Sequence, residues 1–302
     1  MWIQGSTLSI SQRSLLSEHP RSPDQELAQG LAHKLIQGYS SRASVSEALA
    51  LLGSRVELKA AHGREHVIIP VPGGSQLALG LPAGYGVKGG AAREALAALL
   101  QRSSARQPRD IDVVRRGTHP VPEDEQVARR FMPKDFEYGA RVEIIRDMAR
   151  YLSTRDLTIN EAALIGGELT ASVLCVLDSL GKVVRPSRYR GGSLHRKPSL
   201  HGQSLLKMVR LYAEGVSAGE GWSIHGIPEE VSFSDFDLAV HLNKAFQRGR
   251  PVAERFLTTC EILGLIRASA DPIRQALEQL EPLRHGERGL FPDVPAQEWS
   301  FL

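Results

Sequence analysis

Two aspartates stand one residue apart in the stretch RDIDVV, residues 109–114. Side chains alternate between the two faces of a β-strand, so Asp110 and Asp112 are expected to share one face of such a strand. Two carboxylates in a small space repel each other unless a cation lies between them. Magnesium prefers oxygen ligands of this kind and binds through one or two carboxylates together with substrate phosphates. The pair therefore predicts a magnesium site, and the alternative interpretation is a solvated strand end with two surface acids.

A glycine pair precedes these aspartates by about twenty residues, in the stretch GYGVKGGAAR. Gly89 and Gly90 come directly before the strongly helix-forming run AAREALAALLQ. Glycine lets a ligand approach the backbone, and the first turn of a helix offers unpaired amides and the positive end of the helix dipole. Arg93, one turn into this helix, would add positive charge. The pair predicts a phosphate site, although glycines also end strands for purely steric reasons.

A third segment with useful chemistry is TRDLTIN, residues 154–160. Arg155 can bind a triphosphate, while Asp156 and Asn160 can hydrogen-bond a ribose hydroxyl or orient the loop. The alternative is a helix cap, in which Asp156 or Thr158 accepts hydrogen bonds from backbone amides. Together the three segments predict a site with one part for phosphate and another for magnesium.

A strip of basic residues follows, and no acidic residue occurs between Asp178 and Glu214. This local charge contrasts with a formal net charge of only +3, which excludes a general binder of polyanions. Such a strip can follow a nucleic-acid backbone, and the alternative is a solvated basic loop. The residues that we expect to contact RNA are Arg185, Arg188, Arg190, Arg196 and Lys197.

The elements that position these segments follow from the hydrophobic pattern. The alternation around His62 and Gly63 predicts a hairpin, and residues 81–101 predict a strand, a glycine turn and a helix before the strand that holds the aspartates. Residues 115–134 are expected to form a mobile loop, and helices are expected over 27–38, 45–52, 137–153 and 161–180. An interruption of the last helix at Gly166 and Gly167 is the alternative. From about residue 200 the pattern is helical throughout, over 205–214, 235–247, 251–263 and 272–280. The sequence therefore predicts an α+β fold with a small sheet flanked by helices and an all-helical C-terminal lobe.

Length and composition set the remaining limits. The 302 residues suffice for two lobes, and their 42% hydrophobic and 24% charged fractions are those of an ordinary globular protein. Residues 1–23 are expected to form a flexible leader. Cys175 and Cys260 stand far apart and outside any metal-binding spacing, which predicts reduced thiols and a cytoplasmic location. The sequence shows neither a signal peptide nor a run of eighteen apolar residues, so no membrane association is expected.

The stretches GYGVKGGAAREALAAL, RDIDVV and RDLTIN resemble, in order and chemical type, the head domain of the tRNA nucleotidyltransferase and poly(A) polymerase family. The family pattern runs approximately GGxxRDxLL, DxD, RRDFTINA, and LLKMVRLYAE resembles a later family helix. This resemblance implies a nucleotidyltransferase-type head over residues 24–165, with an N-terminal extension, and a mostly helical lobe over 166–302 that binds RNA or nucleotide. It also implies metal ligation by Asp110 and Asp112. Whether a third carboxylate joins this pair stays open, and Glu137 and Glu143 are the candidates. The nucleotide contacts that it implies are Gly89, Gly90, Arg93, Arg155, Asp156 and Asn160.

The activity that the resemblance implies is transfer of a nucleotide from a nucleoside triphosphate to a hydroxyl, with Mg²⁺ as cofactor and an RNA 3′ end as the favoured acceptor. The chain departs from the family pattern at Glu94, at Thr154 and most of all at LHGQS, residues 200–204, where the family carries an EDxxR motif that reads the incoming base. A relaxed or different choice of nucleotide, or an unusual acceptor, is therefore expected in place of strict CCA addition to tRNA. Two alternatives stay open, namely a non-catalytic module that binds RNA or protein, and a nucleotidyltransferase that modifies an acceptor other than RNA.

Overall fold

The computed structural model is described for part of the chain. The described residues are 15, 19–37, 57–61, 64–71, 80–101, 108, 111–130, 142–187, 198–227 and 231–266. They divide into two compact units: one comprises Arg21–Arg190, and the other comprises Gly191–Pro292 together with Met1–Pro20. None of the described helices combines the length and the apolar character that a membrane span requires.

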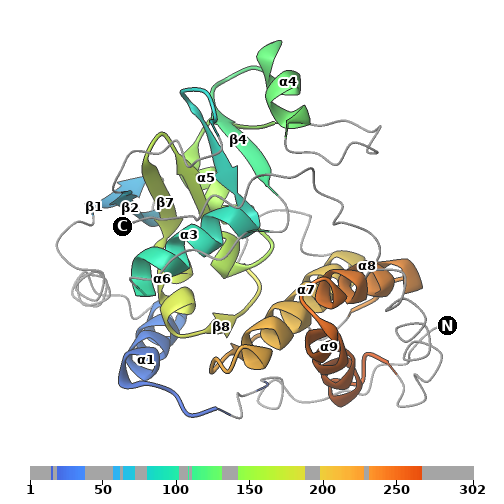
Figure 1. Cartoon of the computed structure of the whole chain (residues 1–302). Coiled ribbons are helices and arrows are strands. Elements are labelled where there is room, and N and C mark those ends of the chain that lie inside the picture. Colours follow the sequence, from blue (N-terminus) through green and yellow to red (C-terminus); the bar gives the residue numbers. More distant parts are fainter. Residues whose placement is uncertain are drawn as a thin grey trace. The chain divides into compact units, whose positions relative to one another are not determined.

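A mixed sheet forms the centre of the first unit (Figure 1). Its described strands are β1 (Glu57–Ala61), β2 (Arg64–Pro70), β3 (Tyr85–Lys88), β4 (Asp112–Arg116), β5 (Glu143–Ile145), β6 (Ala162–Ile165) and β7 (Glu168–Ser172). They lie in the order β1-β2-β7-β6-β3-β4-β5. All neighbouring pairs are antiparallel except β4 and β5, which are parallel. The glycine turn at the end of β3 and the aspartate strand β4 therefore lie next to each other, between β6 and β5.

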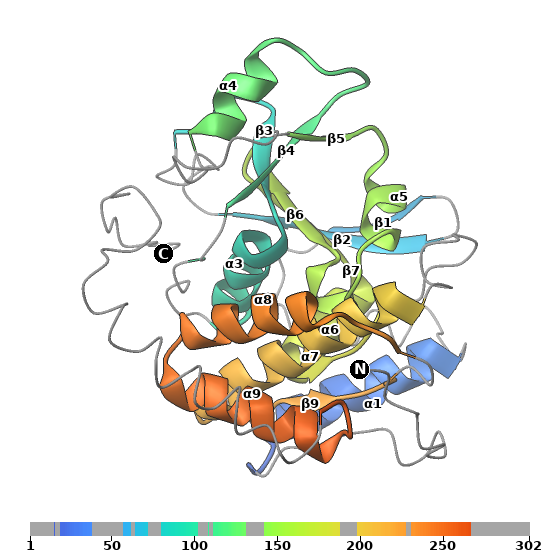
Figure 2. The ribbon, with the colours of Figure 1, turned by 90° about the vertical axis from the view of Figure 1, so that its right-hand side faces the viewer.

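The two faces of this sheet bury different cores. Helices α1 (Pro23–Gln37), α3 (Gly89–Gln101) and α6 (Val173–Leu180) contribute to the larger core, and α5 (Met148–Ser153) contributes to the smaller one. Strand alternation sorts the side chains: Val113 belongs to the larger core and Val114 to the smaller. Figures 1 and 2 show α3 and α5 on opposite sides of the sheet. Asp112 has the parity of Val114 and therefore belongs to the face that α5 covers.

A short helix, α4 (Glu123–Arg129), lies within residues 115–134, for which the sequence predicts a loop. Asp124 fixes this segment to the sheet, because it accepts hydrogen bonds from Tyr85 Oη at 2.7 Å and Arg115 Nε at 2.7 Å. The hydrogen bond from Arg115 lowers the pKa of Asp124 to about 2, against the opposing effect of burial. The prediction of a loop over 115–134 is therefore wrong for α4. The contacts of Asp124 with Tyr85 and Arg115 hold this helix, and they join residues that are distant in sequence.

The described part of the second unit is mostly helical. It contains α7 (Pro198–Ser217), α8 (Asp235–Phe246), α9 (Arg250–Ile262) and the two-residue strand β9 (Ser223–Ile224). Ser234 and Asp237 form a capping box at the start of α8, and Pro251 stands in the first turn of α9. Leu15 pairs with Ile224 through two backbone hydrogen bonds. These local signals explain why the helices after residue 200 are legible in the sequence.

The α+β class is confirmed, as are the hairpin of β1 and β2 and the helices α1, α3, α7, α8 and α9. The prediction of one helix over 161–180 is wrong: β6 and β7 form a hairpin there before α6 begins. Gly166 and Gly167 make its turn with φ of 61° and 84°, a conformation that favours glycine. The helix predicted over 137–153 is also shortened to α5, because residues 143–145 pair with β4 as strand β5. Helices predicted over 45–52 and 272–280, and most of the 1–23 leader, lie outside the described residues.

Candidate active site

The glycine turn and the aspartate strand meet where β3 becomes α3. Lys88, the last residue of β3, is the Cα partner of Asp112 at the start of β4. Gly89 follows with φ of 59°, a left-handed conformation that side chains disfavour. A Cβ atom placed on Gly89 would lie 3.1 Å from Asp112 Oδ2, so the carboxylate lies directly beside this backbone. The amides that open α3, including that of Gly90, therefore start next to a carboxylate.

Asp112 is exposed to solvent and lies on the face of the sheet that α5 covers. Its charge is felt by Tyr151 of α5, whose pKa is raised first by burial and further by the charges of Glu143 and Asp112. Asp110 lies outside the described residues, so its predicted place beside Asp112 stays a prediction.

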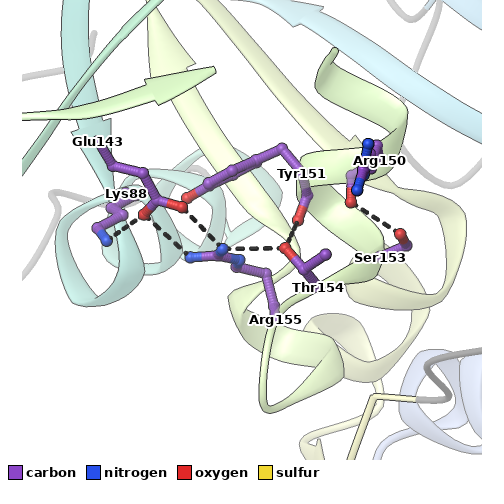
Figure 3. Close-up of polar contacts among 7 residues, drawn as sticks. All are labelled: Lys88, Glu143, Arg150, Tyr151, Ser153, Thr154 and Arg155. Atoms are coloured by element: carbon purple, nitrogen blue, oxygen red, sulfur yellow. Dashed lines mark hydrogen bonds and ion pairs between the residues drawn. The ribbon is translucent and has the colours of Figure 1, made fainter. Parts of the chain in front are cut away.

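Glu143 on β5 forms the centre of a charged cluster on the same face (Figure 3). Lys88 Nζ donates to Glu143 Oε2, and Arg155 Nη2 donates to Glu143 Oε1 at 3.0 Å. The Arg155 guanidinium lies over the Tyr151 ring, 4.1 Å from its centroid, and donates to Thr154 Oγ1 at 3.0 Å. We call Lys88, Glu143 and Arg155 the open cluster, because the Glu143 side chain remains 36% exposed.

The open cluster alters the titration of Glu143. Burial alone would raise the pKa of this carboxyl. The hydrogen bond from Lys88 and the charges of Lys88 and Arg155 outweigh that effect and hold the pKa below its ordinary value. Glu143 is therefore ionised at neutral pH, with two cations of the protein on one carboxylate.

Helix α3 and the TRDLTIN segment are tied together by side chains that the sequence assigned to the nucleotide. Arg93 Nη1 donates to Asn160 Oδ1 at 3.0 Å, and Asn160 Nδ2 donates to Asp156 Oδ1 at 3.0 Å. Arg93 is buried and also contacts the carboxylate of Glu94 at 3.4 Å. These contacts hold the 3₁₀ turn η2 (Thr158–Asn160) against the first turn of α3. Asp156 is thus linked, through Asn160 and Arg93, to the same helix that carries the glycine turn.

A second set of charged residues, Asp178 and Arg185, contacts the η2 turn at Thr158. Thr158 Oγ1 donates to Asp178 Oδ2 at 2.6 Å, and Arg185 Nη2 lies 2.8 Å from Asp178 Oδ1. Arg185 follows the short strand β8 (Val183–Val184), and its backbone oxygen accepts from Thr158 N at 3.1 Å. We call Asp178, Thr158 and Arg185 the closed cluster, because the Asp178 side chain is fully buried. Burial raises the pKa of Asp178 to about 6, although Arg185 and Thr158 oppose this shift.

The structure therefore brings together some of the predicted residues and gives others a different neighbourhood. Gly89, Gly90 and Asp112 lie at one junction, and Arg93, Asp156 and Asn160 form one hydrogen-bonded chain beside it. Arg185, which the sequence assigned to RNA, has its guanidinium on a buried carboxylate and is only 13% exposed. The other predicted RNA contacts lie outside the described residues: Arg188, Arg190, Arg196 and Lys197.

Sequence reasoning missed three contributors to this region, Lys88, Tyr151 and Asp178. Lys88 offered a signal, since a lysine directly before a glycine pair at a strand end faces whatever the next strand presents. Glu143 was named from the sequence as one candidate for a third carboxylate, together with Glu137, which lies outside the described residues. Asp178 gave no signal, because an acid in an apolar helix reads equally well as a surface position.

Carboxylate oxygens suit Mg²⁺, and Asp112 and Glu143 supply them on one face of the sheet. Among the described residues no group of three or more His, Cys, Asp or Glu side chains could hold a metal ion. Chemically the donor set fits a magnesium ion, while both oxygens of Glu143 already contact Lys88 or Arg155. A metal ion that bound Glu143 would have to share the carboxylate with Lys88 and Arg155 or displace one of them.

Comparison with known proteins gives a weak structural likeness. No model of a known protein family matches the chain, and neither does any curated protein. A solved structure described as the complex of a CCA-adding enzyme with CTP matches with a TM-score of 0.40 and 19% sequence identity. The match covers 60% of this chain and 47% of that one, so this chain spans about half the length of the structure that it matches. A likeness of this size does not define a family for the chain.

Proposed function

We propose that this protein is a template-independent nucleotidyltransferase, which transfers a nucleoside monophosphate from a nucleoside triphosphate to a hydroxyl group. One observation carries the proposal: the Asp112 carboxylate lies against the left-handed Gly89 at the start of α3. A carboxylate for a metal and a helix N-terminus for a phosphate are the two things that a metal-bound triphosphate requires. Here they adjoin through the pairing of β3 with β4.

In this proposal the chain's own groups bind and orient the substrate. The amides after Gly89 and Gly90 receive phosphate oxygens, and Asp110 and Asp112 hold Mg²⁺. Magnesium, when bound, would lower the pKa of the acceptor hydroxyl and stabilise the charge of the leaving pyrophosphate. Arg155 contributes positive charge near the triphosphate. Asp156 and Asn160, which Arg93 holds in place, hydrogen-bond the ribose.

The acceptor that we propose is an RNA 3′ end, as in CCA addition to tRNA or poly(A) synthesis. Support comes from the basic strip, in which Arg188, Arg190, Arg196 and Lys197 precede α7 without an intervening acid. The segment LHGQS at 200–204 contains no Glu, Asp or Arg with which to read a base edge. We therefore propose a choice of nucleotide that is relaxed or different from the ordered addition of C, C and A.

Incubation with each labelled nucleoside triphosphate, Mg²⁺ and total RNA tests this function, with the products sized on a denaturing gel. We expect label to enter RNA from at least one nucleotide and to disappear when EDTA replaces Mg²⁺. RNA binding without incorporation would instead indicate a non-catalytic module. Label that resists ribonuclease but not protease would indicate a protein acceptor.

A further inference from the structure

Lys88 lies in an unusual position for a residue beside a metal site. It stands on β3, its contact Glu143 stands on β5, and β4 lies between these strands. Lys88 pairs with Asp112 across one side of β4, and Glu143 pairs with Val114 across the other. The Lys88–Glu143 ion pair therefore crosses the face of β4 right beside Asp112. A cation of the protein occupies the carboxylate face on which the proposed function requires a metal.

The two cations on Glu143 differ in how firmly they are held. Arg155 stacks on Tyr151 and donates to Thr154 as well as to Glu143, so several contacts fix its guanidinium. Among the described residues, Glu143 is the side-chain partner of Lys88 in hydrogen bonds and ion pairs, and the Lys88 ammonium sits on a flexible four-carbon stem. Its side chain is 22% exposed, which leaves it a path toward solvent. Of the two cations, Lys88 is the one that can leave.

A divalent cation and an ammonium group compete for a lone pair of the same carboxylate oxygen. Mg²⁺ binds such an oxygen at about 2.0–2.1 Å, so it takes a lone pair that Lys88 Nζ otherwise uses at Glu143 Oε2. Their charges also repel at short range. Lys88 therefore weakens metal binding at Glu143 Oε2 for as long as it stays in contact with that oxygen.

We propose that Lys88 is a displaceable internal cation, which neutralises the carboxylate face while no metal is bound and which a divalent cation must displace from Glu143. This inference rests on the proposed function, because that function brings the metal to this face. Its consequence is a metal affinity that the protein keeps low through one side chain. A released Lys88 would remain next to Gly89, where its charge favours incoming phosphate.

The test is direct binding of Mn²⁺, followed through the electron paramagnetic resonance signal of the free ion. We expect Lys88→Met to bind Mn²⁺ at least about tenfold more tightly than the unchanged protein, since one repelling charge has gone. Lys88→Arg keeps the charge and should not gain affinity. Arg116→Met is the matched control, because it removes a positive charge from β4 at its half-exposed contact with Glu168.

A second background shows whether Lys88 acts through Glu143. In Glu143→Gln protein the shared carboxylate is absent, and the effect of Lys88→Met should shrink to less than about threefold. Lys88→Gln, which keeps a polar side chain, replaces Lys88→Met if thermal melting shows that the latter is poorly folded.

Equal Mn²⁺ affinities in the unchanged protein and in Lys88→Met overturn the role of Lys88 and leave the proposed function standing. Absence of Mn²⁺ binding in every variant overturns the metal site itself, and the inference falls with it. A tenfold gain that persists in Glu143→Gln protein would also contradict the inference, because it would show a long-range charge effect rather than displacement from Glu143.

Discussion

Asp178 and Glu143 are two of the carboxylates in the sheet unit that pair with an arginine, and they differ in burial. In the closed cluster Asp178 is fully buried on Arg185, and its pKa rises to about 6. In the open cluster Glu143 is half-buried between Lys88 and Arg155, and its pKa falls below the ordinary value. The shifts are opposite because loss of water outweighs the single arginine at Asp178, whereas Lys88 and Arg155 together outweigh it at Glu143.

The comparison indicates a structural role for the closed cluster and a role in ligand exchange for the open cluster. Removing a partner from a buried ion pair leaves an uncompensated charge inside the protein, so the closed cluster is suited to holding the 158–160 turn in one place. A half-exposed pair contributes little to stability and can exchange its partners with a ligand. The open cluster adjoins Asp112 and the glycine turn, where such an exchange is useful.

The largest effect that we expect is a loss of activity on replacing the exposed Asp112. Replacing Asp112 by asparagine keeps the shape of the side chain and removes the charge that would bind metal. Nucleotide transfer should fall by about 10²–10³-fold or more, while thermal melting stays close to that of the unchanged protein. Asp110→Asn should act in the same way.

Glu168→Gln is the control for this loss, since it removes a carboxylate from β7 whose partner among the described residues is the half-exposed Arg116. It should leave transfer unchanged. Full activity in Asp112→Asn would refute the metal site, and a loss of stability that accounts for the lost activity would return Asp112 to a structural role.

The next effect should be the loss of stability on opening the closed cluster. Asp178→Ala leaves the Arg185 guanidinium and the Thr158 hydroxyl without their buried acceptor, so the free energy of unfolding should fall by about 3–5 kcal/mol. Urea denaturation followed by circular dichroism measures it. A change below 1 kcal/mol would mean that water replaces the carboxylate and that the cluster is not closed.

The pH dependence of stability separates the clusters further. The pKa of Asp178 is higher in the folded protein, at about 6, than the ordinary 3.8, so the folded state binds the proton more tightly. Its contribution to stability is therefore fully present below about pH 4 and is lost as the pH rises through 6. Relative to Asp178→Asn, the unchanged protein should lose about 2 kcal/mol of unfolding free energy between pH 4 and pH 7. Denaturant titrations of both proteins at each pH measure this difference, and a flat difference would contradict the raised pKa.

How much of this was legible in the sequence depended on whether the cause was local. The glycine turn, α3 and the helices α7 to α9 carry their signals in consecutive residues, as in the capping box at Ser234. Strands β5 and β6 did not, because three or four apolar residues fit a helix or a strand equally well and the neighbouring strand decides.

The candidate site divides in the same way. The spacing of the aspartates and the glycine pair indicated chemistry that the pairing of β3 and β4 then brought to one place. Lys88 and Glu143 lie 55 residues apart, and Thr158 and Asp178 lie 20 apart, so their contacts depend on the order of strands and not on any local pattern. Sequence patterns thus identified which residues have useful chemistry, and left open which of them form ion pairs or hydrogen bonds with one another.

The smallest effect should come from the open cluster and gives the comparison its sharpest test. Glu143→Gln removes the carboxylate that Lys88 and Arg155 share, yet both cations keep access to water, and Arg155 keeps Tyr151 and Thr154. The free energy of unfolding should therefore fall by about 1 kcal/mol or less at pH 7, several times less than for Asp178→Ala. Raising the salt concentration should reduce even this difference, because exposed charges are screened and buried ones are not. Denaturation of Glu143→Gln and Asp178→Ala at low and high salt decides the matter. Equal losses in both variants would show that the two clusters share one structural role and that Glu143 is not available for exchange with a ligand.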